Sequence, residues 1–438
     1  MQVKSLFVMA AVMAATAQAK VTSLEQAIAT AIANDPWLRS SQHRESAFTA
    51  KSKAALSYSD PKMSLAVMNL PVDSWELNQE PMTQLKVGVT QMLPRGDSLA
   101  IKSEQLRLEA SKQPLLQQQR VAQIEREVSL LWLDIVHANN TLALIERDSV
   151  LFEQMVDIAN ASYSSAVGTT RQQDVIRAQL EVVQLDDKKA LAYQKLNTAK
   201  AKLGQWLMDD NLNLQQATID DNALMALPML RSAAPKLMQT YPIDKQALTA
   251  QINQHPAVLL ADVDSKKAKQ EVAMKEQAYQ PQFAVNASYA YRDDAPVTGS
   301  RADFFSVGVT FDMPLFLEKR QDPLKAAAVA ELEASKTQRF LVLKQLFSGL
   351  NSEIQTVKRL QQRQTLYRDN IIAQSAEQAE AALSAYTNDD GDFAEVVRAR
   401  IAKLNAELSA LAIDIALLKA VARSNYYLAQ VKKDSHHE

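Results

Sequence analysis

One nine-residue segment occurs twice in this chain, and each copy changes from a strand pattern to a helix pattern. The first copy, KVGVTQMLP, begins at Lys86, and the second, SVGVTFDMP, begins at Ser306. Each copy alternates apolar and polar side chains, which is typical of a strand with one buried face, and a long polar helical pattern follows it. The sequence therefore predicts an internal duplication. We expect the junctions between strand and helix at Gly88, Pro94, Gly308 and Pro314.

Composition excludes several classes of protein. The chain of 438 residues has no cysteine, which rules out disulfides, thiolate metal sites and cysteine nucleophiles. A net charge of −2 without a basic patch does not favour a nucleic-acid partner. No Ser-His-Asp arrangement, glycine-rich phosphate loop or HExxH motif is present. We therefore expect a protein that is not an enzyme and that needs no cofactor and no resident metal.

The first 19 residues have the pattern of a secretory signal peptide. Lys4 supplies the positive start, a short apolar run follows, and Ala17-Gln18-Ala19 fits an A-x-A cleavage site. The run is shorter than the roughly 20 residues that a membrane-spanning helix needs. After this segment we expect no stretch apolar enough for such a helix, so a membrane crossing would have to use strands.

The duplication divides the mature chain into similar halves. The predicted ranges are 20–207 for the first repeat, 208–243 for a connector with short helices, 244–430 for the second repeat and 431–438 for a polar tail. Each repeat is expected to contain a helix, two strands, a long helix and a further helix. The predicted strands are 62–69, 82–93, 282–291 and 303–312.

The predicted strands have one apolar and one polar face. In the second of them Leu85, Val87 and Val89 alternate with Lys86, Gly88 and Thr90, and the lysine indicates a face in contact with water. The strand lengths are close to the roughly 9 to 11 residues that cross a bilayer as a tilted strand. Aromatic residues that suit the lipid side are Phe283, Tyr289, Tyr291, Phe305 and Phe311.

Long helices dominate the rest of the chain. The helix predicted after Pro94 continues to near Ala166 and would be about 100 Å long. Its apolar residues recur at alternating steps of three and four, which predicts a coiled-coil partner: Val121, Ile124, Val128, Leu131, Ile135, Ala138, Leu142 and Ile145. A similar seam in the second repeat comprises Phe340, Leu343, Phe347, Leu350, Ile354 and Val357.

Prolines are expected to interrupt these helices, because proline lacks the amide proton and collides with the preceding turn. We expect a kink or break at Asp35-Pro36, a bend or join at Pro114 and an interruption near Pro323. His255-Pro256 occupies the place in the second repeat that Asp35-Pro36 occupies in the first.

Four strands cannot close a membrane barrel, and an open sheet edge is not tolerated in lipid. Three copies of the chain would supply twelve strands. The predicted fold is therefore mostly α with a transmembrane β part: a long coiled-coil barrel of helices and a twelve-stranded barrel in a homotrimer. The alternative is a water-soluble β-sandwich on a coiled-coil stalk, which does not explain one aromatic face and one small polar face.

Several segments together resemble the TolC-like outer-membrane channels of tripartite efflux and secretion systems. They are QMLPRGD, FDMPLFL, DPWL, HPAV, and AVGTTRQQDVIRAQ with its counterpart GDFAEVVRAR. The resemblance implies a passive homotrimeric channel in the outer membrane lipid, with a helical tunnel in the periplasm. It also implies a periplasmic adaptor and an inner-membrane pump as partners. Asp60-Pro61, MNLP and QMLPRGD resemble the heavy-metal efflux branch.

The resemblance also indicates two groups of functional residues at the periplasmic tip. An acidic turn would form a cation-selecting gate around the trimer axis, and Arg398 stands where some family members carry a second acid. The alternative is a solvated turn with an aspartate as helix N-cap. The gate candidates are Asp389, Asp390, Asp392 and Glu395, and the adaptor-docking candidates are Val167, Gly168, Thr169 and Thr170.

The sequence leaves the transported substrate open. Small solutes, heavy-metal cations and secreted polypeptides, as in type I protein secretion, all fit a channel of this architecture. A periplasmic coiled-coil adaptor protein is a further alternative, although such adaptors need a glycine-rich lipoyl-like domain, and this chain has only 8 glycines.

Overall fold

The structure is a computed structural model that describes residues 23–164, 171–208, 225–233, 245–295, 299–388 and 390–431. The chain separates into two compact units, and each unit takes segments from both predicted repeats. Unit 1 comprises 1–36, 121–244 and 349–428, and unit 2 comprises 37–120, 245–348 and 429–438. The predicted signal segment 1–19 lies outside the described residues.

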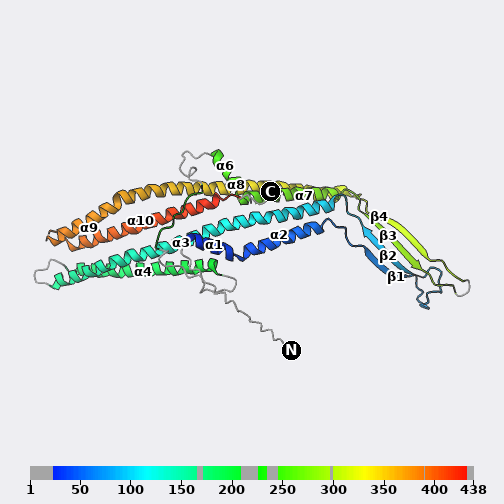
Figure 1. Ribbon diagram of the computed structural model, residues 1–438, viewed down its shortest axis with the longest axis horizontal. Coiled ribbons are helices and arrows are strands. Elements are labelled where there is room, and N and C mark those ends of the chain that lie inside the picture. The colour runs from blue at the N-terminus through cyan, green and yellow to red at the C-terminus, as the bar shows by residue number, and fades with distance from the viewer. Residues whose placement is uncertain are drawn as a thin grey trace, which may run out of the picture. The chain divides into compact units, whose positions relative to one another are not determined.

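Unit 2 contains one four-stranded antiparallel sheet in the order β1-β2-β3-β4 (Figure 1). The strands are β1 (Lys62–Met68), β2 (Gln84–Met92), β3 (Phe283–Tyr291) and β4 (Phe304–Phe311). All four predicted strands are present, each within two residues of its expected ends. Neighbours in sequence pair as hairpins, and β2 pairs with β3 across the two predicted repeats.

The helices of unit 2 are joined by polar contacts as well as by buried apolar side chains such as Leu248 and Val258. They are α2 (Pro36–Ala54), the first part of α3 (Ser98–Ser164), α6 (Lys245–Ile252), α7 (Pro256–Gln277) and the first part of α8 (Gln321–Leu366). The buried Ser41 hydroxyl donates to the side-chain oxygen of Gln113 over 3.0 Å. Lys112 of α3 pairs with Asp264 of α7 over 2.6 Å, so charged side chains also tie these two helices together.

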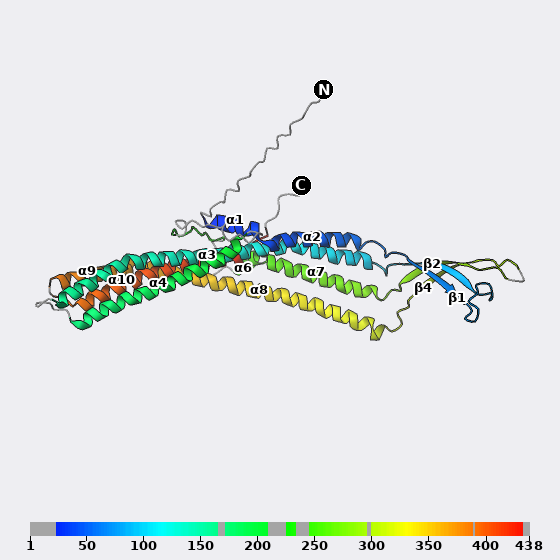
Figure 2. The same ribbon diagram turned by 90° about the horizontal axis from the view of Figure 1, so that it is seen from below.

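Unit 1 is a helical assembly (Figure 2), and buried apolar side chains from several of its helices form one cluster. Its elements are α1 (Leu24–Asn34), the second part of α3, α4 (Gln172–Leu207), the end of α8, α9 (Ile372–Thr387) and α10 (Phe393–Tyr427). Ile124, Val128 and Ile135 of the predicted α3 seam are fully buried, which confirms its coiled-coil character. Phe152, Val175 and Phe393 join α3, α4 and α10 in one cluster.

A short π-helix, Tyr367–Ile371, separates α8 from α9. No proline or glycine lies in this segment, so the sequence pattern did not reveal it. Arg368 within the π-helix pairs with Asp414 of α10 over 3.0 Å, and Gln364 donates to the same carboxylate over 2.6 Å. Asp414 therefore fixes the π-helical turn to α10.

The prolines act in three different ways. At Asp35-Pro36 the helix breaks as predicted, because Asp35 is extended and α2 restarts at Pro36. His255 likewise caps α7, which begins at Pro256. Pro114 lies inside an unbroken α3, so the predicted join is absent there. Pro323 falls in the first turn of α8, where the missing amide proton costs no helical hydrogen bond.

Two further expectations need correction. The seam predicted from Phe340 is buried only farther along α8: Phe340 is 64% exposed, whereas Leu350 is fully buried. The expectation that no helix is apolar enough for a membrane span is wrong for α3. An 18-residue stretch of α3 has a mean hydropathy of 1.3, and half of it is buried. Trp132, Leu133 and Val136 of this helix are buried beside the seam.

Residues 225–233 of the predicted connector are described and form no helix. Hydrogen bonds tie them to unit 1: Asn140 of α3 donates to the carbonyl of Met225 over 3.0 Å. Asn425 of α10 donates to the carbonyl of Arg231 over 3.0 Å and accepts from the amide of Ala233 over 2.8 Å. The rest of the connector lies outside the described residues.

Candidate functional site

The register of the sheet places apolar side chains in continuous rows on one face. Leu65 lies opposite Val87, Val87 opposite Tyr289, and Tyr289 opposite Phe305. Antiparallel partners project to the same side, so all four belong to one face. They are exposed by 73%, 43%, 50% and 72%, respectively. Unit 2 alone therefore leaves a broad apolar surface in contact with solvent.

The opposite face of the sheet is small and polar. One row runs Ser64, Gly88, Ser288 and Ser306 across the four strands. A Cβ atom at Gly88 would lie 2.7 Å from the Ser64 hydroxyl oxygen. A Cβ atom at Gly308 would lie 2.6 Å from the side-chain amide oxygen of Asn286. Both predicted glycines thus leave room for polar side chains of the neighbouring strand.

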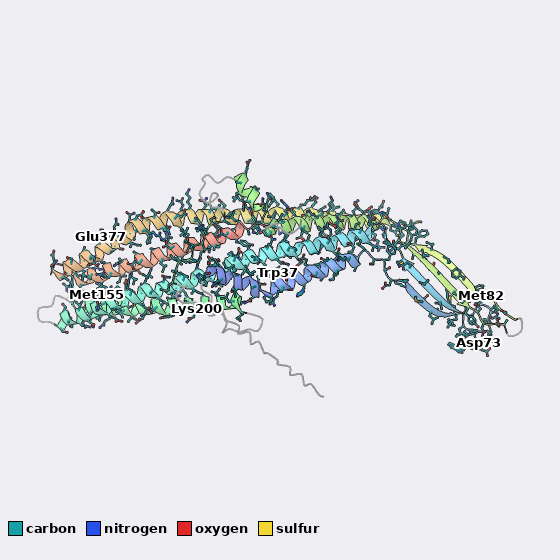
Figure 3. All side chains as sticks on the ribbon, viewed as in Figure 1. Trp37, Asp73, Met82, Met155, Lys200 and Glu377 are labelled. Carbon is teal, nitrogen blue, oxygen red and sulfur yellow. The ribbon has the colours of Figure 1, made fainter. Side chains whose placement is uncertain are left out.

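The sheet has two open edges within one chain. β1 and β4 are the outer strands, and no described strand pairs with the free edge of either. The backbone groups along these edges can bond a further strand. At the far end of the sheet, the β1–β2 loop carries Asp73 and ends near Met82 (Figure 3). Arg292 and Arg301 of the second hairpin donate to the carbonyls of Pro81 and Glu80.

An ion pair joins the two strand-to-helix junctions. Pro94 and Pro314 lie in the linkers that follow β2 and β4, whereas Gly88 and Gly308, also predicted at the junctions, lie inside these strands. Arg95, the next residue after Pro94, pairs with Asp312 and donates to the carbonyl of Ala278 over 3.2 Å. The backbone amide of Gln282 donates to Asp312 over 2.5 Å. This hydrogen bond, aided by the Arg95 charge, holds the pKa of Asp312 below its usual value.

Gly96 makes the first junction possible. Its φ of +49° lies in the left-handed region that side chains disfavour. A Cβ atom there would meet the amide oxygens of Gln277 and Gln280. Gln277 also accepts from the backbone amide of Asp97 over 3.0 Å, just before α3 begins. The segment QMLPRGD contains Arg95 and Gly96, but its pattern did not reveal their roles, because a charged residue beside a glycine is a common combination.

In the described part of the acidic turn, Asp390, Asp392 and Glu395 bond to residues close to them in the sequence. The side chain of Asp392 caps α10 and accepts from the amide of Ala394 over 3.2 Å. Glu395 pairs with Arg398 one turn later, over 3.1 Å. The amide of Asp390 donates to the carbonyl of Ala385 over 3.0 Å. Among the described residues of one chain, no group of three acids or histidines could hold a metal ion.

Two sets of predicted residues lie outside the described residues: Asp389, and the adaptor-docking candidates Val167, Gly168, Thr169 and Thr170. The helices that lead to the latter are described up to Ser164 and from Gln172. On these helices apolar side chains remain exposed, among them Ile158 at 51%, Leu180 at 53% and Val183 at 63%. Unit 1 therefore also presents apolar surface that a single chain does not cover.

Solved structures that superpose on this chain include outer-membrane channels. CusC, studied for transmembrane channel formation, superposes with a TM-score of 0.72 at 14% identity, over 94% of this chain and 93% of CusC. For the CmeC outer membrane channel of Campylobacter jejuni the TM-score is 0.73 at 11% identity, over 93% and 85% of the two chains. The chain has the fold of an outer-membrane channel.

The open state of the MtrE outer membrane channel of Neisseria gonorrhoeae agrees with this fold, with a TM-score of 0.70 at 13% identity over 93% of this chain and 89% of MtrE. No family model and no curated protein matches the sequence. The predicted channel fold, mostly helical with four antiparallel strands, is therefore confirmed by structure where sequence comparison finds no relative. Closure of the sheet by three copies stays a prediction.

Proposed function

We propose that three copies of this chain form a passive channel through the outer membrane, with the helices in the periplasm. The observation that carries the proposal is the two-faced sheet with two free edges. In lipid every backbone group needs a hydrogen-bond partner, so β4 of one copy would pair with β1 of the next. Twelve strands then close without an edge.

The faces of the sheet fit such a barrel. The row Leu65, Val87, Tyr289 and Phe305 would contact lipid, and the row Ser64, Gly88, Ser288 and Ser306 would line a water-filled lumen. Neither role suits a β-sandwich, which would bury the apolar face against a second sheet. The exposed apolar residues of α3 and α4 would be covered by helices of the neighbouring copies, as in a coiled coil.

We infer that the channel serves a tripartite efflux system. Its partners would be a periplasmic adaptor, docking at Val167–Thr170, and an inner-membrane pump that supplies the energy. The polar lumen row favours small solutes, and heavy-metal cations are one class that the acidic turn would suit. The chain itself would catalyse no reaction, because a conduit only has to open and close.

Membrane location and conductance test the proposal. Cells that produce the chain are separated into soluble, inner-membrane and outer-membrane fractions, and the purified protein is added to a planar lipid bilayer. We expect a trimer in the outer-membrane fraction and discrete conductance steps in the bilayer. A soluble periplasmic monomer without conductance would contradict the channel and would favour an adaptor.

The substrate class requires a separate comparison. A deletion strain is tested for growth on metal salts, dyes and drugs, and for export of a reporter polypeptide. Sensitivity to small solutes with normal polypeptide export would support efflux. Loss of polypeptide export alone would show that the channel serves protein secretion instead.

A further inference from the structure

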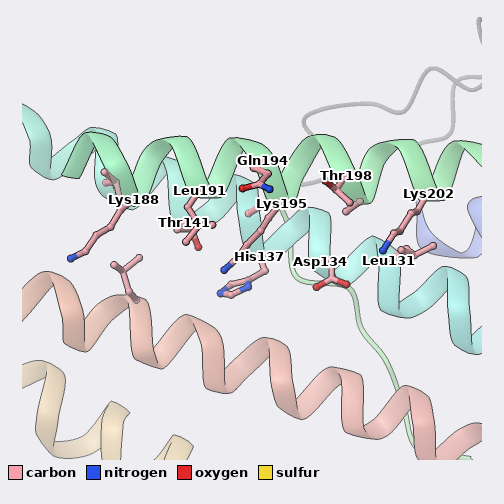
Figure 4. Close-up of a pocket in the computed structure, with 15 residues that line it drawn as sticks. Leu131, Asp134, His137, Thr141, Lys188, Leu191, Gln194, Lys195, Thr198 and Lys202 are labelled. Atoms are coloured by element: carbon pink, nitrogen blue, oxygen red, sulfur yellow. The ribbon is translucent and has the colours of Figure 1, made fainter. Parts of the chain in front are cut away.

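A cavity of about 630 Å³ lies in unit 1 between α3 and α4, with Leu408 of α10 in its wall (Figure 4). This volume falls within the range of about 300–1,000 Å³ that is usual for small-molecule sites. The predicted channel function does not use the cavity, which is distant in sequence from the strands, the junctions and the acidic turn.

Positive charge dominates the cavity wall. Lys188, Lys195 and Lys202 follow one another at intervals of seven residues along α4, so they project from the same side of that helix. Lys188 donates to the side-chain oxygen of Asn405 over 3.4 Å, which leaves its charge uncompensated. The ion pairs among the described residues include neither Lys195 nor Lys202.

Asp134 is the one acid among the described residues that line the cavity, and it is already paired. Asp134 of α3 forms an ion pair with Lys419, which reaches it from α10. His137 lies one turn farther along α3, and Figure 4 shows it beside the side chain of Lys195. Burial, with the charges of Lys419 and Lys195, lowers the pKa of His137 despite the opposing effect of Asp134. The imidazole is therefore neutral near pH 7, and the unbalanced charge is that of the lysines.

The other residues of the cavity wall are apolar or carry uncharged polar groups. Leu131, Leu191 and Leu408 provide apolar surface, and the hydroxyl groups of Thr141 and Thr198 can donate hydrogen bonds. A ligand that matches this wall has one anionic group and a flat or branched hydrocarbon body. A metal cation does not match it, because the lysines would repel the ion.

We propose that this cavity binds small amphipathic organic anions, with the anionic group held by Lys195 and Lys202 and the apolar body against Leu131, Leu191 and Leu408. Charge complementarity supplies the selectivity, and burial of the hydrocarbon supplies much of the affinity. The inference concerns unit 1 alone and stands whether or not the strands close into a barrel.

Calorimetric titration with two probes of the same body tests the charge requirement. The full-length protein in lipid nanodiscs is titrated with 5-dimethylaminonaphthalene-1-sulfonate and, separately, with the neutral sulfonamide of the same ring, and empty nanodiscs serve as the blank. We expect saturable binding of the sulfonate that is about tenfold tighter than that of the sulfonamide.

Variants locate the binding. Lys195→Gln together with Lys202→Gln should weaken sulfonate binding about tenfold and leave sulfonamide binding unchanged. Arg177→Gln together with Lys189→Gln removes the same charge from α4 outside the cavity wall and should leave both affinities unchanged. Circular dichroism of each variant checks that the helices remain folded.

The pH dependence gives an independent readout. The groups that face His137 are Asp134 on its own helix, Lys195 on α4 and Lys419 on α10. A bound anion stabilises the imidazolium, so sulfonate affinity should rise as the pH falls toward the lowered pKa of His137. The sulfonate stays ionised over this range. His137→Gln should abolish the rise.

Three results would overturn the inference: no saturable binding above the blank, equal affinity for the two probes, or equal effects of the two double variants. A neighbouring copy that fills the cavity in the assembled protein would produce the first of these results. Because only binding is measured, a protein that conducts ions without binding the sulfonate refutes this inference and leaves the proposed channel intact.

Discussion

The guanidinium of Arg95 forms an ion pair with the carboxylate of Asp312, which lies 217 positions later in the chain. Arg95 follows β2 and Asp312 follows β4, so the pair connects the two places where the sheet ends. Through Ala278 and Gln282, the same two side chains also reach the end of α7 and the start of β3. The two junctions thus form one structural unit.

We predict that acid weakens this unit through Asp312. The lowered pKa of Asp312 means that its ionised form is favoured in the folded protein. Its stabilising effect is therefore complete above the usual aspartate pKa of about 3.9, and it is lost as the pH falls toward the lowered value. Asp312→Asn should reduce stability at pH 7 and flatten the acid side of the stability curve.

The measurement is the thermal midpoint of unfolding between pH 7 and pH 3, followed by circular dichroism. Glu318→Gln is the control. This substitution also removes one negative charge, but from the linker before α8, where the carboxylate does not pair with Arg95. Arg95→Gln should reproduce the loss at pH 7. Parallel curves for Asp312→Asn and the parent protein would refute a role for the ion pair.

A glycine substitution is predicted to act in opposite directions at two positions. Gly96→Ala places a side chain at φ +49° and against Gln277, and should cost about 1–2 kcal/mol. Gly204→Ala, within α4, meets no atom within 4 Å and should stabilise the protein by about 0.5–1 kcal/mol. Chemical denaturation of both variants measures the two changes, and equal signs would contradict the strain at Gly96.

The two faces of β2 should differ in their tolerance of charge. Val87 projects from the apolar face and Thr90 from the polar face, three residues along the same strand. Val87→Lys would expose an ammonium to lipid near the bilayer centre, at a cost of about 2–4 kcal/mol. We expect it to reduce the yield of trimer in the outer-membrane fraction, whereas Thr90→Lys should assemble normally. Equal yields would argue against a lipid-facing sheet.

Removing acidic groups at the tip should change ion block. The variant carries Asp389→Asn, Asp390→Asn and Glu395→Gln, and keeps Asp392 because that residue caps α10. If three copies place these acids around one axis, the variant should show a higher leak conductance and a several-fold weaker block by Ca²⁺.

The matched control for this experiment removes three acids from the surface of α4, at Glu181, Asp186 and Asp187. Planar-bilayer recordings with increasing Ca²⁺ compare the two variants. Identical leak conductance and block in both would show that the acidic turn is only a solvated helix start.

Local pattern was sufficient to predict most of the fold. Alternation at Leu85, Val87 and Val89 located β2, and the three-four spacing from Ile124 located the buried side of α3. Contacts between distant segments were not predictable in this way. Arg95 can pair with Asp312 because β2 and β4 end at the same edge of the sheet. That alignment is set by the register of the strands and cannot be read from either segment alone. The exposure of Phe340 similarly depends on which helices lie beside it.

The charges in the wall of the unit 1 cavity were missed for a related reason. From sequence alone, a solvated side of α4 accounts for the three lysines, Lys188, Lys195 and Lys202. The packing of α3 and α10 against α4 brings Asp134, His137 and Lys419 next to them. Lysines at intervals of seven residues are common on exposed helices, so their spacing did not indicate a site.

The π-helix at Tyr367–Ile371 accommodates one extra residue per turn without ending the helix. An insertion of a single residue can therefore persist in this half of the chain, because the shift in phase is confined to one turn that Asp414 secures. The unbroken α3 shows no such turn between Ser98 and Ser164. A helix with such a turn can therefore be one residue longer than its neighbour while the contacts before and after the turn keep their alignment.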